Sequence, residues 1–207
     1  MLTCHNEVSI PPESPFITRL YPKWGLVHVQ TREEIQKLRD DLFSCDKKFR
    51  DWGLPPGHVS AKLETILPFN FRQFVNAIYS LYLKQVNKES ARWGDKNPLH
   101  LNYIGLLMDL FPKGKFVHIV RDRRAVLNSF INSNRKAGKI YPNTPCEAAK
   151  YWIAALGASY PFRNHRQYFE LCYENLLTRP KEELRLVCEF LQISYLPAEM
   201  LSYPIMN

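Results

Sequence analysis

The sequence predicts an α/β protein in which helices cover both faces of a parallel sheet, giving three layers, α/β/α. The apolar run at residues 116–120 shows no alternation, which is typical of a strand buried on both faces. A second strand pattern at residues 168–174 leads into an amphipathic helix, and helical patterns surround the first strand. At 207 residues, 45% of them hydrophobic, the chain can bury one sizeable core. We therefore expect a single domain over residues 1–207.

The first half of the chain reads as helices separated by proline-rich loops. Residues 1–60 contain the loop signals IPPESPF and GLPPGH around one expected helix from Thr31 to Phe43. From Pro68 to Lys88, apolar residues recur every three or four positions, which predicts a helix that buries this stripe. Another helix is expected from Pro98 to Leu110, where the segment FPKGK ends it.

The second half reads as strand, helix, helix, strand, helix. The strand expected at Phe116–Val120 is followed almost at once by a helix from Arg123 to Lys136. The segment TPCE, beginning at Thr144, has an N-cap threonine, a proline at the first helical position and a glutamate three residues after the cap, which predicts a helix to about Ser159. A strand from Tyr168 to Glu174 then precedes the amphipathic helix RPKEELRLVCEFLQI.

Composition narrows the classes of partner and the compartment. Lys and Arg exceed Asp and Glu by 28 to 20, a net charge of +8, which suits an anionic partner. The basic residues do not cluster with aromatics in a stripe and no nucleic-acid-binding motif occurs, so we expect no nucleic-acid partner. The five cysteines form no C-x-x-C pair, and no long apolar or signal-like segment occurs. We therefore expect a cytoplasmic protein without a metal or a membrane span.

A candidate anion site lies at the end of the first strand pattern. Arg121 directly follows the strand, at the edge where parallel sheets present helix N-termini and their unpaired N–H groups to ligands. Ser129 comes eight residues later, about two turns into the next helix, so both side chains can reach one phosphate. By spacing alone, Arg121 and Arg124 fit equally well as solvated charges paired with Asp122.

Four segments resemble the sulfotransferases that use 3′-phosphoadenosine 5′-phosphosulfate (PAPS). LFPKGKFVHIVRDRRAVLNSF is similar to the segment that binds the 3′-phosphate of PAPS in that family, and Arg121 and Ser129 occupy the positions of its arginine and serine. Three other stretches follow in the family's order: PPESPFITRLYPKWG, WGDKNP and CYENLLTRPKEELRLVCEFLQISY. The likeness is to the bacterial-type branch and the tyrosylprotein sulfotransferases. It implies a P-loop-NTPase-like fold and sulfuryl transfer from PAPS to a hydroxyl acceptor.

The resemblance implies roles for three more residues. Glu13 stands where the tyrosylprotein-type enzymes carry a catalytic glutamate, so it is the candidate general base. Lys96 matches the lysine of the family's K-x-P turn and would neutralise charge on the sulfuryl group or the leaving phosphate. Tyr173, at the end of the second strand, is a candidate contact for the nucleotide. Each also has an ordinary alternative: a turn-capping acid, a solvated lysine and a buried strand aromatic.

Two parts of the family pattern are expected to be missing. The resemblance places Met1 after the family's first strand and its P-R-S-G-T-T loop, and neither RSGT nor GxxxxGK[ST] occurs in the sequence. The C-terminal segment that closes over the nucleotide is also short. We therefore expect little PAPS turnover by the chain as given, and self-association through a partly uncovered sheet surface. The alternative is a truncated, non-catalytic relative that acts as a nucleotide-binding or interaction module.

The sequence leaves the acceptor open. Residues 26–92 would shape the acceptor side in the family, and their aromatic side chains fit the core at least as well as a pocket. Protein tyrosine, a sugar hydroxyl, a lipid head group and a small alcohol are all compatible with the sequence. A P-loop kinase is a weaker alternative, because it needs a glycine-rich loop with a lysine that the sequence does not contain.

Overall fold

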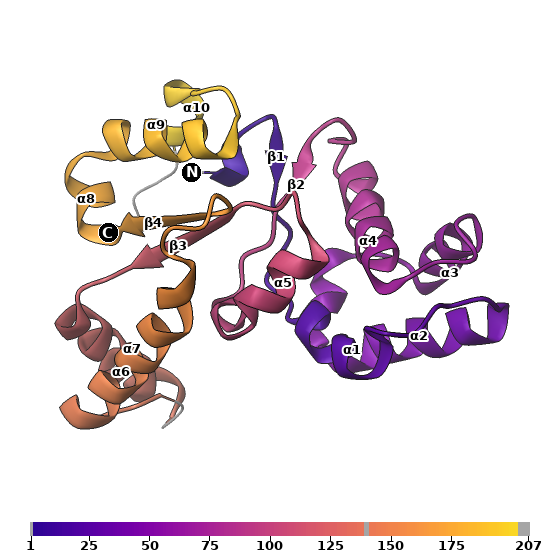
Figure 1. The fold of residues 1–207 in the computed structure, drawn as a ribbon, viewed down its shortest axis with the longest axis horizontal. Coiled ribbons are helices and arrows are strands. Elements are labelled where there is room, and N and C mark those ends of the chain that lie inside the picture. The colour runs from indigo at the N-terminus through magenta and orange to yellow at the C-terminus, as the bar shows by residue number, and fades with distance from the viewer. Residues whose placement is uncertain (1, 139–140, 203–207) are drawn as a thin grey trace. The chain divides into compact units, whose positions relative to one another are not determined.

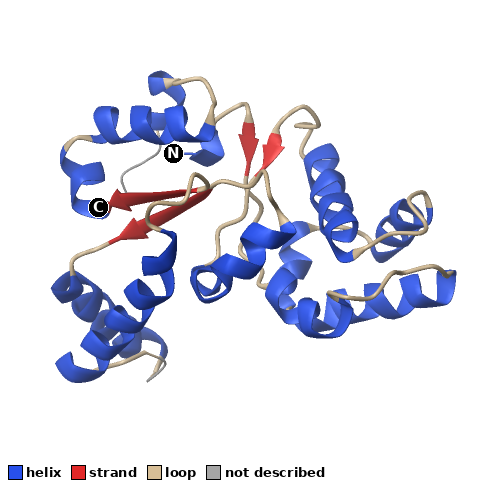
Figure 2. Ribbon diagram, in the orientation of Figure 1, coloured by secondary structure: helices blue, strands red, loops and turns tan. Residues whose placement is uncertain are grey.

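The computed structural model describes residues 2–138 and 141–202, and it is an α/β protein with parallel strands. The chain forms two compact units. Unit 1 contains the described residues up to His100 together with those from Leu196 onward, and unit 2 is Leu101–Tyr195. Figure 2 shows that helices predominate, joined by loops, and that the strands are short. The expectation of one domain over residues 1–207 stays a prediction.

Unit 1 is mainly helical, with α1 to α4 packed in sequence order (Figure 1). Its α-helices are α1 (Phe16–Trp24), α2 (Arg32–Cys45), α3 (Pro56–Glu64), α4 (Phe71–Gln85) and α10 (Pro197–Leu201). The 3₁₀ helices are η1 (Leu2–Cys4), η2 (Lys47–Trp52) and η3 (Pro98–Tyr103), the last of which begins in unit 1. The short strands β1 (Val8–Ser9) and β2 (Arg92–Trp93) pair in parallel.

The helices predicted at 31–43 and 68–88 are present as α2 and α4, each with a complete capping box. In α2, the Thr31 hydroxyl accepts from the Glu34 N–H while the Glu34 carboxylate accepts from the Thr31 N–H. Asn70 and Gln73 make the equivalent pair at the start of α4. The sequence patterns did not predict α1 and α3. Proline signals led to loops there, whereas Pro22 is accommodated inside α1 and Pro56 begins α3.

An aromatic cluster forms the core of unit 1. The rings of Phe16, Phe49 and Trp52 meet at centroid distances of 5.1 to 5.7 Å. Phe74 and Tyr79 also contact Phe16, and all five side chains are almost completely buried. Such pairs add edge-to-face attraction to the burial of apolar area. The aromatic residues within 26–92 therefore serve mainly as core, as the sequence suggested.

Unit 2 is built on the parallel pair β3 (Phe116–Val120) and β4 (Tyr168–Cys172), in the register Phe116↔Tyr168 to Val120↔Cys172. Its α-helices are α5 (Ile104–Leu110), α6 (Arg123–Ala137), α7 (Pro145–Ser159), α8 (Tyr173–Thr178) and α9 (Pro180–Leu191), with the 3₁₀ turn η4 (Tyr160–Phe162) after α7. The predicted order of elements is confirmed, including the capping box at Thr144 and Glu147.

Three details of unit 2 differ from the expectations. The segment predicted as a helix from Pro98 begins as the 3₁₀ helix η3 and becomes α-helical at Ile104. The second strand ends at Cys172, so Tyr173 is the first residue of α8 and not a strand residue. The strand expected to be buried on both faces is only partly covered, and Ile119 is 53% exposed. In the described part of the chain, no helix combines the length and apolar character needed to cross a bilayer.

Candidate functional site

The end of β3 is tied to the end of β4 by side chains that hold backbone groups. Asp122 is the N-cap of α6, and its carboxylate accepts from the Arg124 N–H at 2.8 Å. The Arg124 side chain and these cap bonds lower the pKa of Asp122 to about 2. The Asp122 N–H in turn donates to the Glu174 carboxylate at 3.0 Å. The turn that follows β3 is therefore held by α8, the helix that follows β4.

Arg121 occupies this turn and is held on two sides. The guanidinium lies over the Tyr173 ring at 4.7 Å from the ring centroid. The Trp152 indole N–H, from α7, donates to the Arg121 carbonyl oxygen at 3.0 Å. Arg121 Nε is buried and has no hydrogen-bond partner in the part of the chain that the structure describes. An arginine so positioned, with a donor still unpaired, fits an anionic group in its vicinity.

A hollow of about 410 Å³ lies along one face of α6 and begins at Arg121. Its lining residues are Arg121, Ala125, Asn128, Ser129, Asn132, Ser133 and Lys136. The spacing of three and four positions places them on one side of the helix, as expected for Arg121 and Ser129. The lining carries two cationic and several neutral polar side chains, which suits a phosphate. The structure thus brings the three predicted nucleotide residues, Arg121, Ser129 and Tyr173, into one neighbourhood of unit 2.

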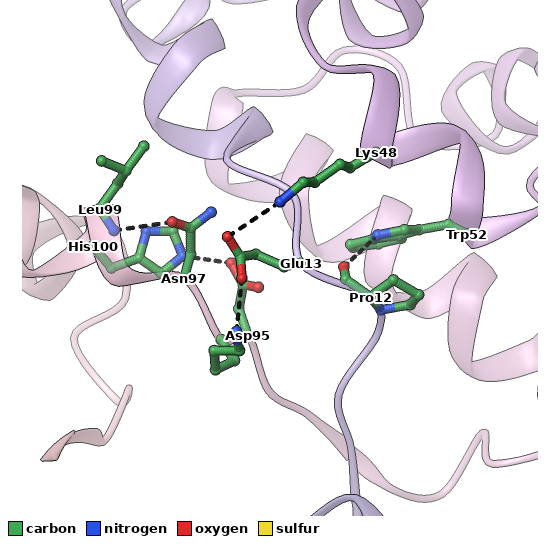
Figure 3. A network of polar contacts seen from close by, with 9 residues as sticks. Pro12, Glu13, Lys48, Trp52, Asp95, Asn97, Leu99 and His100 are labelled. Atoms are coloured by element: carbon green, nitrogen blue, oxygen red, sulfur yellow. Dashed lines mark hydrogen bonds and ion pairs between the residues drawn. The ribbon is translucent and has the colours of Figure 1, made fainter. Parts of the chain in front are cut away.

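The two predicted catalytic residues meet in unit 1. Lys96 Nζ donates to Glu13 Oε2 at 2.6 Å, although the residues are 83 positions apart in sequence. Lys48 Nζ, from η2, lies 3.7 Å from the other carboxylate oxygen, Oε1. Figure 3 shows the Glu13 carboxylate between Lys48 and the turn that carries Asp95 and Asn97. The Glu13 side chain is 30% exposed, so the carboxylate is supported by the protein and still open to solvent.

The charge on Glu13 is stabilised mainly by Lys96. The hydrogen bond from Lys96 lowers the pKa of Glu13 below its ordinary value, partial burial opposes this, and Lys48 adds to the lowering. Glu13 is therefore ionised at neutral pH, in the state that can accept a proton. A carboxylate paired with ammonium groups also loses basicity, which makes its release from Lys96 relevant to any role as a base.

Buried groups position both members of this pair. The Trp52 indole N–H donates to the Pro12 carbonyl oxygen at 2.8 Å and so holds the residue before Glu13 (Figure 3). On the other side, His100 Nε2 lies 2.5 Å from Asp95 Oδ2, next to Lys96. The Asn97 side chain accepts from the Leu99 N–H at 2.9 Å. These hydrogen bonds fix the conformation of the segment from Asp95 to His100, and with it the position of Lys96.

Three site residues were not singled out from the sequence as members of the site. Lys48 follows another lysine in an irregular segment, and no motif distinguishes it. Trp152 lies in a helix recognised by its capping box, where a tryptophan ordinarily indicates core. His100 is a lone histidine near a turn, which is usually structural, and in the structure it is bonded to Asp95 beside the candidate lysine. Lys48 and Trp152 act through contacts between segments far apart in sequence, which spacing does not reveal. The partner of His100 is only five positions away.

Comparisons of the sequence and of the structure with known proteins lead to the same family. A model of the sulfotransferase family matches residues 1–197. A Caenorhabditis briggsae protein whose name describes it as a protein-tyrosine sulfotransferase is 26% identical over 129 residues, which are 60% of this chain and 45% of the relative. The omega-hydroxy-beta-dihydromenaquinone-9 sulfotransferase Stf3 of Mycobacterium bovis is 28% identical over 116 residues, 49% of this chain and 30% of that protein. The chain thus spans less than half the length of these curated relatives.

Two solved structures have the same fold. The sulfotransferase domain from the curacin biosynthetic pathway superposes with a TM-score of 0.59 at 18% identity, covering 98% of this chain and 71% of that domain. The sulfotransferase domain from the Synechococcus PCC 7002 olefin synthase gives a TM-score of 0.63 at 19% identity, with coverage of 98% and 70%. At such identities the likeness establishes the fold and leaves the substrates open.

Proposed function

This chain belongs to the sulfotransferase family, and on that premise we propose that it transfers a sulfuryl group from PAPS to a hydroxyl acceptor. The observation that carries the proposal is the ion pair between Glu13 and Lys96 at 2.6 Å. It joins a carboxylate that can accept a proton to a cation that can stabilise developing negative charge. Transfer of a sulfuryl group to an alcohol needs both, together with positioning of the two substrates.

The donor supplies an activated sulfuryl group whose leaving group is the 5′-phosphate of the nucleotide. We assign Arg121 and Ser129 to the 3′-phosphate, because a buried arginine donor without a partner and a polar hollow along α6 suit a phosphate. Tyr173 orients the Arg121 guanidinium by stacking on it. None of these groups changes its charge during transfer. Their role is to bind and orient.

In unit 1, Glu13 takes the proton of the acceptor hydroxyl as that oxygen forms its bond to sulfur. The bond between sulfur and the oxygen of the 5′-phosphate breaks, and its electron pair stays on the phosphate. Lys96 stabilises the charge that builds up on the sulfuryl oxygens and the departing phosphate. The products are a sulfate ester, adenosine 3′,5′-bisphosphate and a protonated Glu13, which then returns its proton to solvent.

The name of each relative suggests one class of acceptor for a first experiment. Purified protein would be incubated with ³⁵S-labelled PAPS and four kinds of hydroxyl: a tyrosine peptide, a hydroxylated isoprenoid quinone, a sugar and a simple alcohol. We expect labelled sulfate ester from at least one, in small amount, because the sequence contains neither RSGT nor GxxxxGK[ST] to hold the 5′-phosphosulfate. Binding of adenosine 3′,5′-bisphosphate without transfer to any of them would overturn catalysis and favour a non-catalytic nucleotide-binding relative. Absence of both binding and transfer would overturn the nucleotide assignment as well.

A further inference from the structure

The Glu13 carboxylate is held by two lysines, one on each oxygen. Lys96 Nζ lies 2.6 Å from Oε2, and Lys48 Nζ lies 3.7 Å from Oε1. These are the charged side chains that act on Glu13 from the two segments around it, η2 and the turn after β2. The paired Asp95 and His100 belong to the same neighbourhood (Figure 3). Neither lysine is buried, since their side chains are 62% and 68% exposed, so both can change rotamer.

The proposed roles of Glu13 and Lys96 conflict while they are bonded to each other. In the structure, the positive charge of Lys96 is paired with Glu13, and the Lys96 ammonium group occupies Oε2. During transfer, Lys96 has to face the sulfuryl group, and one carboxylate oxygen has to receive the hydroxyl proton. The short ion pair therefore has to open, and Glu13 then loses its strongest partner.

The segment that carries Lys48 is anchored beside Glu13, independently of Lys96. It belongs to η2, whose Phe49 and Trp52 side chains are fully buried in the aromatic core. Trp52 also donates to the carbonyl oxygen of Pro12, the residue before Glu13. The segment that carries Lys48 is thus bonded, through the Trp52 side chain, to the residue before Glu13. Lys96 reaches Glu13 from a separate segment.

We propose that Lys48 is a positioning residue that holds Glu13 through Oε1 while Lys96 moves from Oε2 to the transferring group. The inference rests on the proposed sulfuryl transfer. It assigns Oε2 as the oxygen that accepts the hydroxyl proton. Lys48 keeps the carboxylate oriented and ionised until the proton arrives. Its contact with Glu13 weakens once that carboxylate is neutral, which favours return of the proton to solvent.

Lys47 provides a matched control for Lys48. It is the preceding residue on η2, its side chain is exposed, and it forms no ion pair in the described residues. Lys47→Met and Lys48→Met remove the same charge from the same short helix. A general effect of net charge would change both variants alike. Lys48→Arg keeps the cation and should retain the function.

The first test follows the Glu13 carboxyl carbon by NMR during a pH titration, and it needs no turnover. Lys48→Met should raise the pKa of Glu13 in the wild-type background and again in Lys96→Met, which imitates the departure of Lys96. Lys47→Met should leave the titration unchanged, and Lys48→Arg should keep the wild-type curve. The inference would be overturned if the pKa of Glu13 were the same in Lys96→Met and in the double variant Lys48→Met/Lys96→Met.

The second test is the pH dependence of transfer. Lys48→Met should move the acid limb of the kcat profile to higher pH and lower kcat by up to about 100-fold, with KM for PAPS unchanged. A purely structural role would lower the amount of folded protein without moving that limb. Absence of transfer by the wild type would overturn the proposed function and this inference together. Transfer by the wild type with identical profiles for Lys48→Met and Lys47→Met would overturn the inference alone.

Discussion

The guanidinium of Arg121 lies over the ring of Tyr173, 4.7 Å from the ring centroid. The two residues directly follow β3 and β4, whose last register pair is Val120↔Cys172. Parallel pairing therefore brings them side by side, with the cation over the face of the ring. The edge of the guanidinium carries its N–H donors, which makes the arrangement suitable for a planar contact with a phosphate.

Arg121→Ala should weaken binding of adenosine 3′,5′-bisphosphate. Loss of a charge-assisted contact costs about 2 kcal/mol, or roughly 30-fold in Kd. Isothermal titration calorimetry would measure the change. Arg123→Ala is the control, because Arg123 is exposed on the same turn and does not line the hollow. Equal affinities for Arg121→Ala and wild type would remove Arg121 from the nucleotide site.

Trp152→Phe should weaken the same binding by a smaller factor. The substitution keeps an aromatic side chain but removes the N–H that donates to the Arg121 carbonyl oxygen at 3.0 Å. A neutral hydrogen bond contributes about 1 kcal/mol, so we expect a loss of roughly fivefold. Calorimetry beside Arg121→Ala gives the comparison. A loss as large as that of Arg121→Ala would show that the indole contacts the ligand or supports the whole turn.

Glu13→Gln should abolish most of the transfer while leaving the nucleotide bound. The amide keeps the size of the side chain and an oxygen for Lys96, but it cannot accept the hydroxyl proton. Loss of a general base lowers the rate by roughly 10²–10⁴-fold. Transfer from labelled PAPS and calorimetry with adenosine 3′,5′-bisphosphate would be measured on the same preparation. An unchanged rate would place the base elsewhere, with His100 as the next residue to substitute.

His118 should make the folded protein sensitive to mild acid. It is half-buried on β3, its Nδ1 lies 2.7 Å from the Tyr168 hydroxyl, and burial lowers its pKa. Because the folded pKa lies below the unfolded one, the unfolded state binds the proton more tightly. The stability contributed by neutral His118 is complete above the unfolded pKa and is lost as pH falls through the folded pKa.

His118→Gln should therefore reduce the acid sensitivity. Nearby Glu170 and Arg163 act on His118 in opposite directions, and both are kept in the variant. Thermal denaturation from about pH 8 to about pH 5 would compare the two proteins across the ordinary histidine range. The wild-type Tm should fall further than that of His118→Gln. Parallel pH curves would show that His118 does not contribute to acid destabilisation.

Local signals in the sequence predicted most of the fold of unit 2. The unalternating run at residues 116–120, the capping box at Thr144 and the amphipathic pattern of α9 each depend on neighbours within a few positions, and all three elements are present. Where a local signal had two meanings, the prediction failed. Pro15 and Pro56, in the loop signals IPPESPF and GLPPGH, were interpreted as loop residues, yet Pro15 is the N-cap of α1, Pro56 begins α3, and packing in unit 1 stabilises both helices.

The sequence alone determined the parts of the candidate site that follow from spacing. Arg121 at a strand end and Ser129 about two helical turns later share a face because the α-helix has a fixed period. Only the tertiary structure decided that Lys48 and Lys96 hold opposite oxygens of Glu13 and that Trp152 bonds to Arg121. Such contacts join segments up to 83 positions apart. They arise from how buried elements pack against one another, and no short-range pattern encodes that packing.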